Sequence, residues 1–211
     1  MKRLPVRATL LFFAVAFAII VPFCIWGGAI EAWFDGQMKL ASAHPERTAL
    51  VLFGLLATDI VLPVPSSLVS TCCGLTLGFP VGFLISFMAM NVSAGLGYLL
   101  GRFGARYAAN LIGVRDQKIL ESFARNGAKW LLLLLRPVPV LAEASVLFSG
   151  IARQPIKRAA GEVLLGNVIV SAVYVAVGTW GKTADSMLLA LGATLVVADI
   201  CLVVGRKQRR L

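Results

Sequence analysis

Long stretches of uncharged, mostly apolar residues alternate with short polar and basic segments along this chain. Residues 60–101 contain no charge over 42 positions, whereas one crossing of a bilayer's hydrocarbon core takes about 20 apolar residues. A first membrane span is predicted over residues 8–26 and a last one over 188–205. The pattern therefore predicts a single membrane domain over residues 1–211.

The motif Pro-Val-Pro interrupts two of the apolar stretches. Proline removes a backbone donor and disfavours helix in the residue before it, so each motif should end one half-helix and allow another to begin. The prolines are Pro63, Pro65, Pro137 and Pro139. Further pairs recur at a spacing of 76 residues, namely Gly74 with Gly150, Asn91 with Asn167, Gly95 with Ser171 and Tyr98 with Tyr174. Two repeats, 48–101 and 130–181, are expected, as in transporters with internal symmetry.

The basic residues at the edges of the apolar stretches indicate how the chain is oriented. If every stretch crossed the bilayer once from a cytoplasmic N-terminus, the basic segment 102–129 would lie outside, against the positive-inside tendency. If the two proline-broken stretches instead enter and return on the same side, 16 of the 20 lysines and arginines lie inside. We therefore expect segment 102–129 and both termini to be cytoplasmic.

This arrangement defines the expected fold class. It is an all-α polytopic membrane protein with two inverted repeats, each a proline-broken re-entrant hairpin followed by a transmembrane helix, plus flanking transmembrane helices. Non-helical backbone at membrane depth must be surrounded by protein or water, so the two hairpin tips should meet near the midplane.

Composition excludes several classes of protein. Hydrophobic residues make up 59% of the chain and charged residues 14%, against about a quarter charged in soluble domains. We attribute the net charge of +10 to membrane orientation and not to nucleic acid binding. The four cysteines form no C-x-x-C pair and the only histidine is His44, so no metal or cofactor is expected. The sequence contains no plausible pair of a nucleophile and a general base, so we do not expect an enzyme.

Two charges next to the proline motifs are the first candidates for function. Asp59 lies four residues before Pro63, near the end of a half-helix whose dipole disfavours an acid. Intramembrane charges are costly and usually functional. Arg136 follows five leucines and needs a carboxylate, carbonyls, water or a lipid phosphate as its partner. If the tips meet, Asp59 and Arg136 are natural partners; the alternatives are a headgroup-level aspartate and a purely structural ion pair.

The other polar residues have weaker claims. Ser66 and Ser67 are expected to cap a new half-helix whose N-terminus would attract an anion such as phosphate, or only to satisfy local backbone donors. Glu143 is expected in the first turn after Pro139, where the helix dipole favours it. A structural role, bonding to the broken hairpin backbone, is expected for Asn91 and Asn167. Two further acids, Glu162 and Asp199, are expected near the inner interface, where water reaches them.

At these residues the chain resembles the DedA family, also described as the VTT or SNARE-associated Golgi protein group. The resemblance covers about residues 59–181. It rests on Asp59-x-x-x-Pro63-x-Pro65, Gly95-x-Gly97-Tyr98-x-x-Gly101-Arg102, and Arg136-Pro137-Val138-Pro139 followed by Gly150 and Asn167. It implies two inverted re-entrant hairpins and lipid translocation, with undecaprenyl phosphate recycling in some bacterial members, phospholipid scrambling in some eukaryotic ones, and dependence on the proton-motive force in parts of the family.

The chain departs from the family pattern at two places. Many bacterial members have a second acid after the first prolines, where this chain has Ser66 and Ser67. Many have a second arginine six residues after the first, where this chain has Ala142 followed by Glu143. These departures weaken the expectation of a phosphate held by two arginines.

The leading functional hypothesis is a lipid translocase of a bacterial inner membrane. Its partners would be membrane lipids, either phospholipid or undecaprenyl phosphate, together with protons. Asp59, Arg136, Ser66, Ser67 and Glu143 would form the transport site. The alternatives are a small-ion or proton-coupled transporter and a non-catalytic assembly or scaffold protein.

Overall fold

The computed structural model describes residues 10, 17, 45–61, 64, 66–126, 131–136 and 139–180. Within these residues every regular element is a helix. The helices are α2 (Pro45–Ala57), α3 (Ser66–Ile112), α4 (Val114–Asn126), α5 (Leu131–Leu135), α6 (Pro139–Ile151) and α7 (Ile156–Trp180). The expected spans 8–26 and 188–205 fall mostly or wholly outside the described residues, as do Asp199 and the prolines Pro63, Pro65 and Pro137.

Helix α3 is two helices joined at Gly78. This glycine has φ 71° and ψ 172°, in a region that residues with a Cβ rarely adopt. It separates a short segment, 66–77, from a long one, 79–112. Pro80 lies in the first turn of the long segment, where its missing N–H costs nothing. The long segment continues past residue 101, where the apolar stretch ends, because no helix-breaking residue occurs before Gly113, which has φ 89°.

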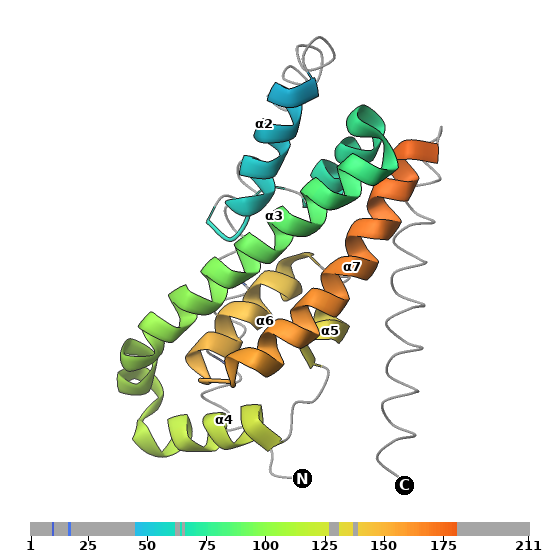
Figure 1. Cartoon of the computed structure of the whole chain (residues 1–211). Helices are drawn as coiled ribbons and strands as arrows, with labels where there is room; N and C mark the ends of the chain where they lie inside the picture. Colours follow the sequence, from blue (N-terminus) through green and yellow to red (C-terminus); the bar gives the residue numbers. More distant parts are fainter. Residues whose placement is uncertain are drawn as a thin grey trace, which may run out of the picture.

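Two long helices run through the molecule, and the shorter helices lie in two groups, one in each half (Figure 1). The long segment of α3 and α7 run side by side along most of the molecule. Helix α2 and the short segment of α3 occupy one half, and α5 and α6 occupy the other. Helix α4 lies across the end near α6. The turns after α2 and after α5 therefore both lie in the middle of the molecule.

The short segment of α3 packs on the C-terminal end of α7 through glycines. A Cβ added at Gly74 would collide with the carbonyl of Val175, and one added at Gly178 would collide with the carbonyl of Thr71. The Oγ1 of Thr179 also donates a 3.1 Å hydrogen bond to the Gly74 carbonyl. Two helix backbones are thus in direct contact, which only small residues allow.

The other half of the chain contains the same crossing. A Cβ at Gly150 of α6 would collide with the carbonyl of Tyr98, and one at Gly101 of α3 would collide with the carbonyl of Leu147. These positions are counterparts, 76 or 77 residues away, of those in the first crossing. Each short helix therefore packs on the long helix of the other half of the chain.

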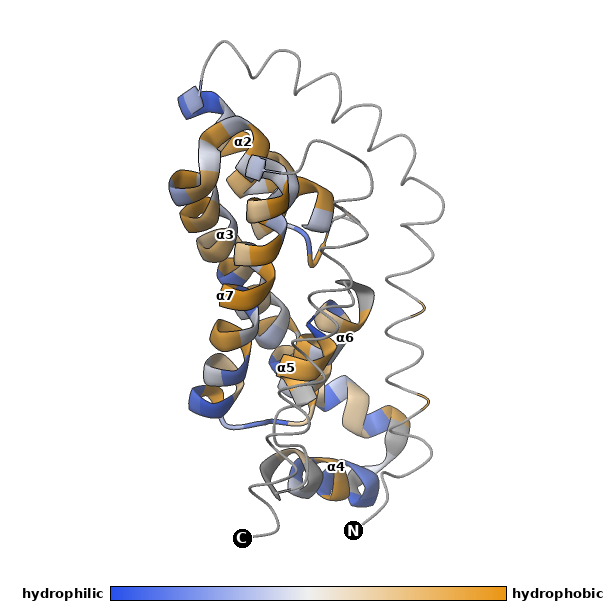
Figure 2. Ribbon diagram, turned by 90° about the vertical axis from the view of Figure 1, so that its right-hand side faces the viewer, coloured by the Kyte–Doolittle hydropathy of each residue, from blue (hydrophilic) through white to orange (hydrophobic). Residues whose placement is uncertain are grey.

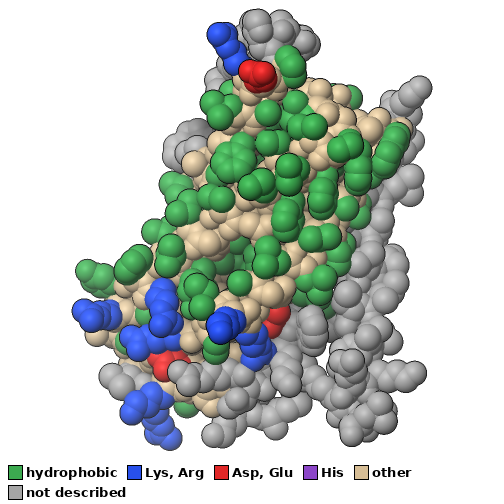
Figure 3. Space-filling model, viewed as in Figure 1, with side chains coloured by type: hydrophobic (Ala, Val, Ile, Leu, Met, Phe, Trp, Pro, Cys, Tyr) green, Lys and Arg blue, Asp and Glu red, His purple; other side chains and the backbone are tan. Residues whose placement is uncertain are grey.

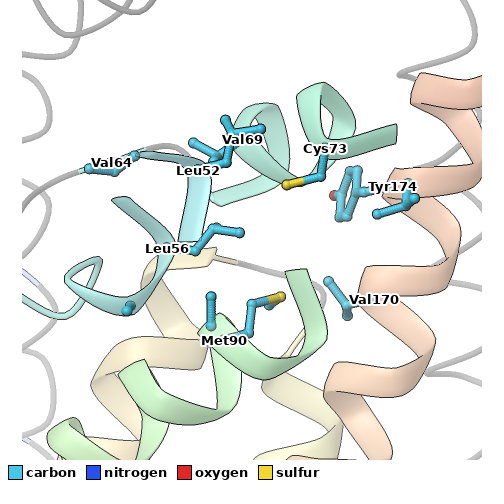
Figure 4. Close-up of a cluster of buried hydrophobic side chains, with 11 residues drawn as sticks. Leu52, Leu56, Val64, Val69, Cys73, Met90, Val170 and Tyr174 are labelled. Atoms are coloured by element: carbon cyan, nitrogen blue, oxygen red, sulfur yellow. The ribbon is translucent and has the colours of Figure 1, made fainter. Parts of the chain in front are cut away.

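A cluster of buried apolar side chains fills the space between α2, both segments of α3 and α7 (Figure 4). Leu56 and Cys73 are fully buried there, and Val64 attaches the turn between α2 and α3 to the same cluster. The cluster also includes Leu52, Val69, Met90, Val170 and Tyr174. It holds the turn that carries Asp59 against the long helices.

Outside this core, most residues of α3 and α7 are hydrophobic (Figure 2), and apolar side chains cover the face of the molecule seen in Figure 3. Exposed apolar side chains on them include Leu84, Met88, Leu96, Leu100, Phe103, Leu164 and Leu165. Among the described residues, two helical stretches are long and apolar enough to cross a bilayer: Ser66–Leu111, which bends at Gly78, and Ile156–Trp180. Lysines and arginines gather instead at the end that α4 occupies (Figure 3). Large exposed apolar surfaces mark contact with a membrane or another protein, and helices this long and apolar favour the membrane.

Candidate functional site

A small cavity lies at mid-height, where the turn after α2 meets the turn after α5. Its volume is about 30 Å³, enough for about two water molecules. All five predicted transport residues line it: Asp59, Ser66, Ser67, Arg136 and Glu143. Met90, Ser93 and Tyr174 complete its polar and polarisable lining. Residues from both halves of the chain therefore line one small, partly open cavity.

Asp59 is held in place by the turn that follows α2. The helix ends at Ala57, and the turn closes with a 2.8 Å hydrogen bond from the Val61 amide to the Thr58 carbonyl. The Ile60 amide donates to Ser93 Oγ at 3.3 Å, which ties the turn to α3. Asp59 is 8% exposed, so protein surrounds its side chain.

Arg136 enters the cavity from the opposite side. It follows α5 directly, and its backbone amide donates to the Leu133 carbonyl at 3.3 Å. The aliphatic part of its side chain packs against Gly166 of α7, where an added Cβ would lie 2.7 Å from the Arg136 Cγ. The residue is 7% exposed. Its Nε and Nη2 find no hydrogen-bond partner among the described residues.

Glu143 lines the same cavity as Asp59, but it does not lie in the first turn of its helix, where it was expected. Helix α6 begins at Pro139, so Glu143 lies beyond the first turn and its side chain is directed into the cavity. It lies within hydrogen-bonding range of Asp59, and Arg136 interacts electrostatically with both acids. The cavity therefore brings two acids together beside a buried cation.

Asp59 and Arg136 were expected to pair, but they do not form an ion pair within 4.0 Å and interact only electrostatically. Among the described residues the ion pairs within 4.0 Å are Arg153–Glu121 and Arg158–Glu162. Arg136 shares the cavity and interacts with Asp59 electrostatically, but Asp59 Oδ1 accepts no hydrogen bond from these residues. Charged atoms that lack partners in a buried site remain able to bind something else.

The serines lie at the start of α3, as the sequence indicates. The helix begins at Ser66, whose side chain is within hydrogen-bonding range of Asp59. Ser67 follows in the first turn, and its carbonyl accepts a 2.9 Å hydrogen bond from Thr71 Oγ1. The N-terminal end of the short segment of α3 thus borders the cavity that contains Arg136.

The two asparagines bond to each other, which corrects the expectation that they bond to hairpin backbone. Asn167 Nδ2 donates to Asn91 Oδ1 at 3.0 Å, and Asn91 Nδ2 donates to the Phe87 carbonyl at 2.6 Å. Each lies on a long helix, Asn91 on α3 and Asn167 on α7, so the bond joins these two helices directly. Their matched positions in the sequence carried the signal for this pairing.

Glu162 is buried and structural, not exposed to water at an interface. It is 6% exposed. One carboxylate oxygen accepts the Leu132 amide at 3.3 Å and the other accepts Arg158 Nε at 3.1 Å. Leu132 lies in the first turn of α5, so Glu162 satisfies a backbone donor at that helix start and helps to position Arg136. The sequence offered no signal for this contact.

Tyr174 also lines the cavity, although the sequence did not mark it as a site residue. The only sequence signal was its match with Tyr98 at a spacing of 76 residues. Tyr174 is 3% exposed and lies next to Met90 and Val170 in the buried cluster (Figure 4). Tyr98, its counterpart, donates a 2.7 Å hydrogen bond to the Gln154 carbonyl in the turn between α6 and α7. The repeated tyrosines therefore anchor different parts of the molecule.

Comparison with known proteins gives one match. No curated protein and no solved structure matches the chain. The family model of the VTT domain matches residues 64–180, more than half of the chain, and this range includes both long helices and every cavity residue named above except Asp59. Together with the apolar surfaces of α3 and α7, this match identifies the chain as an integral membrane protein that belongs to the VTT-domain family.

Proposed function

We propose that this protein is a membrane lipid translocase that moves an anionic, phosphate-bearing lipid headgroup past two re-entrant hairpin tips. The hairpins would be α2 with the short segment of α3, and α5 with α6. Support comes from their turns at mid-height and from the reciprocal crossings at Gly74 and Gly150. A two-fold relation exchanges the halves in this way, as in inverted repeats.

The observation that carries the proposal is the incompletely paired guanidinium of Arg136. An arginine buried in a membrane protein is costly unless its donors are satisfied. Arg136 Nε and Nη2 lack partners among the described residues, and they lie in a cavity formed by both turns. A guanidinium binds phosphate oxygens through two parallel hydrogen bonds. A lipid phosphate supplies the missing acceptors and balances the charge.

The two acids give this site a way to release the phosphate. While Asp59 and Glu143 share a proton, the pair carries a single negative charge. This charge competes only weakly with the lipid phosphate for Arg136. Loss of the proton would leave two carboxylates beside the arginine, and these would displace a bound phosphate. Proton transfer would thus be coupled to headgroup movement, as expected if the proton-motive force drives the cycle.

The small volume of the cavity sets a structural requirement for this mechanism. A lipid headgroup does not fit in about 30 Å³, a volume that suits about two waters. The two turns must therefore move apart during transport. The glycine crossings leave each short helix attached to the long helix of the other half, so the turns can separate while these helices stay packed.

The proposed setting is a bacterial inner membrane with both termini in the cytoplasm. The basic end of the molecule, with Arg102, Arg106, Arg115, Lys118 and Lys157, supports a cytoplasmic location for α4. The substrate would be a phospholipid or undecaprenyl phosphate. Both carry the phosphate that Arg136 would bind.

The experiment is a translocation assay in liposomes. Purified protein is reconstituted with fluorescent phospholipid, and a membrane-impermeant quencher then reports how fast inner-leaflet lipid reaches the outside. Wild type is compared with Arg136→Ala and Asp59→Asn, after both variants are shown to fold. The proposal predicts fast loss of the protected signal with wild type alone. No acceleration by wild type, with either a phospholipid or a polyprenyl phosphate, contradicts it.

A small-ion or proton-coupled transporter is the second candidate. The observation that favours it is the contact between Asp59 and Glu143, because a carboxyl pair that holds one proton is a common element of proton relays. It predicts proton flux that does not depend on the lipid headgroup. A scaffold, in contrast, would tolerate neutral residues at Asp59 and Arg136 provided that the fold is kept.

A further inference from the structure

A second, larger cavity lies between α3, α6 and α7 on the basic half of the molecule. Its volume is about 280 Å³, close to the lower end of the range of about 300–1,000 Å³ that small-molecule sites occupy. Gly95 and Leu99 of α3 form one wall and Ala160 and Leu164 of α7 form the other. The side chains of Leu99 and Leu164 are about half exposed, so the cavity is a groove that opens on the apolar outer face of these helices.

The polar residues in the wall of this groove have their donors engaged elsewhere. Asn91 donates to the Phe87 carbonyl, Tyr98 to the Gln154 carbonyl and Ser149 to the Val146 carbonyl, at 2.6, 2.7 and 2.7 Å. The Oδ1 of Asn91 also accepts from Asn167. The hydroxyls of Tyr98 and Ser149 therefore have no donor left for an occupant, and Asn91 has both its Oδ1 and one Nδ2 hydrogen engaged within the protein. A mainly apolar occupant fits such a wall.

The groove is the immediate neighbour of the charged cavity. Ala94 of α3 and Val146 of α6 line both spaces. On one side of these two residues are the Arg136 donors that have no partner among the described residues, and on the other is the apolar groove. The charged cavity matches an anionic phosphate in charge, and the apolar groove beside it matches a hydrocarbon chain in polarity. Together they are complementary to an amphiphile that carries both.

We propose that the groove binds one hydrocarbon chain of a lipid whose phosphate reaches Arg136. This inference rests on the proposed function and adds a chain-binding site to it. The chain lies between α3 and α7 with its far end in the membrane. The groove keeps it oriented while the headgroup passes the turns, so the protein selects lipids by chain as well as by headgroup.

Gly95 provides a direct test, because the groove can be filled there without disturbing the helices. A Cβ added at Gly95 meets nothing within 4 Å, and the same holds at Gly161 of α7, which does not line the groove. Gly95→Leu and the matched control Gly161→Leu are reconstituted in phosphatidylcholine vesicles with fluorescent phosphatidylglycerol. We expect Gly95→Leu to slow translocation about tenfold or more, the equivalent of about 1.4 kcal/mol, while Gly161→Leu stays within about twofold of wild type.

A binding measurement tests the groove independently of transport. Wild type and both variants are illuminated in phosphatidylcholine vesicles that contain phosphatidylglycerol with a diazirine in one acyl chain, and the labelled residues are identified by mass spectrometry. We expect label on the groove-lining segments of α3 and α7 in wild type and Gly161→Leu, and its loss in Gly95→Leu. Even labelling of all exposed apolar positions, or a groove left unlabelled in wild type because a second copy or another segment of the chain fills it, overturns the inference.

The two measurements separate the groove from the proposed function. If wild type moves lipid and Gly95→Leu moves it equally fast, the groove inference fails while lipid translocation stands. If wild type moves no lipid but the groove is labelled selectively, translocation fails while chain binding stands.

Discussion

Asn167 donates a 3.0 Å hydrogen bond to Asn91, a residue 76 positions earlier in the chain. The same spacing separates Gly74 from Gly150, the glycines at the two helix crossings. Equivalent residues of two halves touch each other only where a two-fold axis passes between them. In the proposed inverted-repeat arrangement, this pair of asparagines marks that axis, close to the cavity that both halves build.

The asparagine pair should show energetic coupling. Asn167→Leu removes a buried donor and leaves Asn91 Oδ1 without its partner, so we expect the free energy of unfolding to fall by about 1–3 kcal/mol. The double variant Asn91→Leu/Asn167→Leu removes both amides and should lose less than the sum of the two single variants. Thermal unfolding of all four proteins in detergent gives the coupling energy. Strict additivity would show that the hydrogen bond contributes nothing to stability.

Close backbone contact at the crossings predicts a sharp difference between two glycines. Gly150→Ala places a methyl group against the carbonyl of Tyr98 and must push α6 away from α3, so we expect a loss of about 1–3 kcal/mol. Gly104 lies in α3, the helix against which Gly150 packs, and a Cβ added there meets nothing within 4 Å. Gly104→Ala should therefore be neutral, or stabilising by about 0.5–1 kcal/mol through its better helix propensity. Equal unfolding temperatures for the two variants would contradict this account of the crossing.

Tyr98 should stabilise the turn between α6 and α7 through its hydroxyl. Tyr98→Phe deletes the 2.7 Å hydrogen bond to the Gln154 carbonyl, in a side chain that is only 7% exposed. We expect unfolding to become easier by about 1–3 kcal/mol, because the carbonyl loses its partner in a buried setting. Tyr107→Phe is the matched control, since Tyr107 is 76% exposed, and it should change stability by less than about 0.5 kcal/mol. The pair is compared by chemical denaturation in the same detergent.

The sequence was sufficient to predict much of the site because proline and charge are local signals. The proline motifs and the cost of intramembrane charge led to Asp59 and Arg136, and the structure brings both to one cavity. The start of α3 at Ser66 and its break at Gly78 also follow from residues with strong backbone preferences.

Contacts set by helix rotation and long-range packing could not be predicted in this way. Glu143 reaches Asp59 because α6 begins at Pro139 and turns that side of the helix toward the cavity. Glu162 reaches the start of α5 across 30 residues of sequence. The asparagine pairing needed the spatial relation of two long helices, which a spacing of 76 residues suggests but does not specify.

The most direct test of the central claim neutralises the cavity charges together. Replacing Asp59, Arg136 and Glu143 by Asn, Gln and Gln keeps the shapes of the two acids, shortens the arginine and leaves no unpaired charge, so the fold should survive. The rate of lipid translocation is then measured in the quenching assay for this triple variant and for wild type. The account predicts a folded protein that moves lipid no faster than protein-free liposomes. A triple variant that moves lipid as fast as wild type would show that these charges do not carry transport.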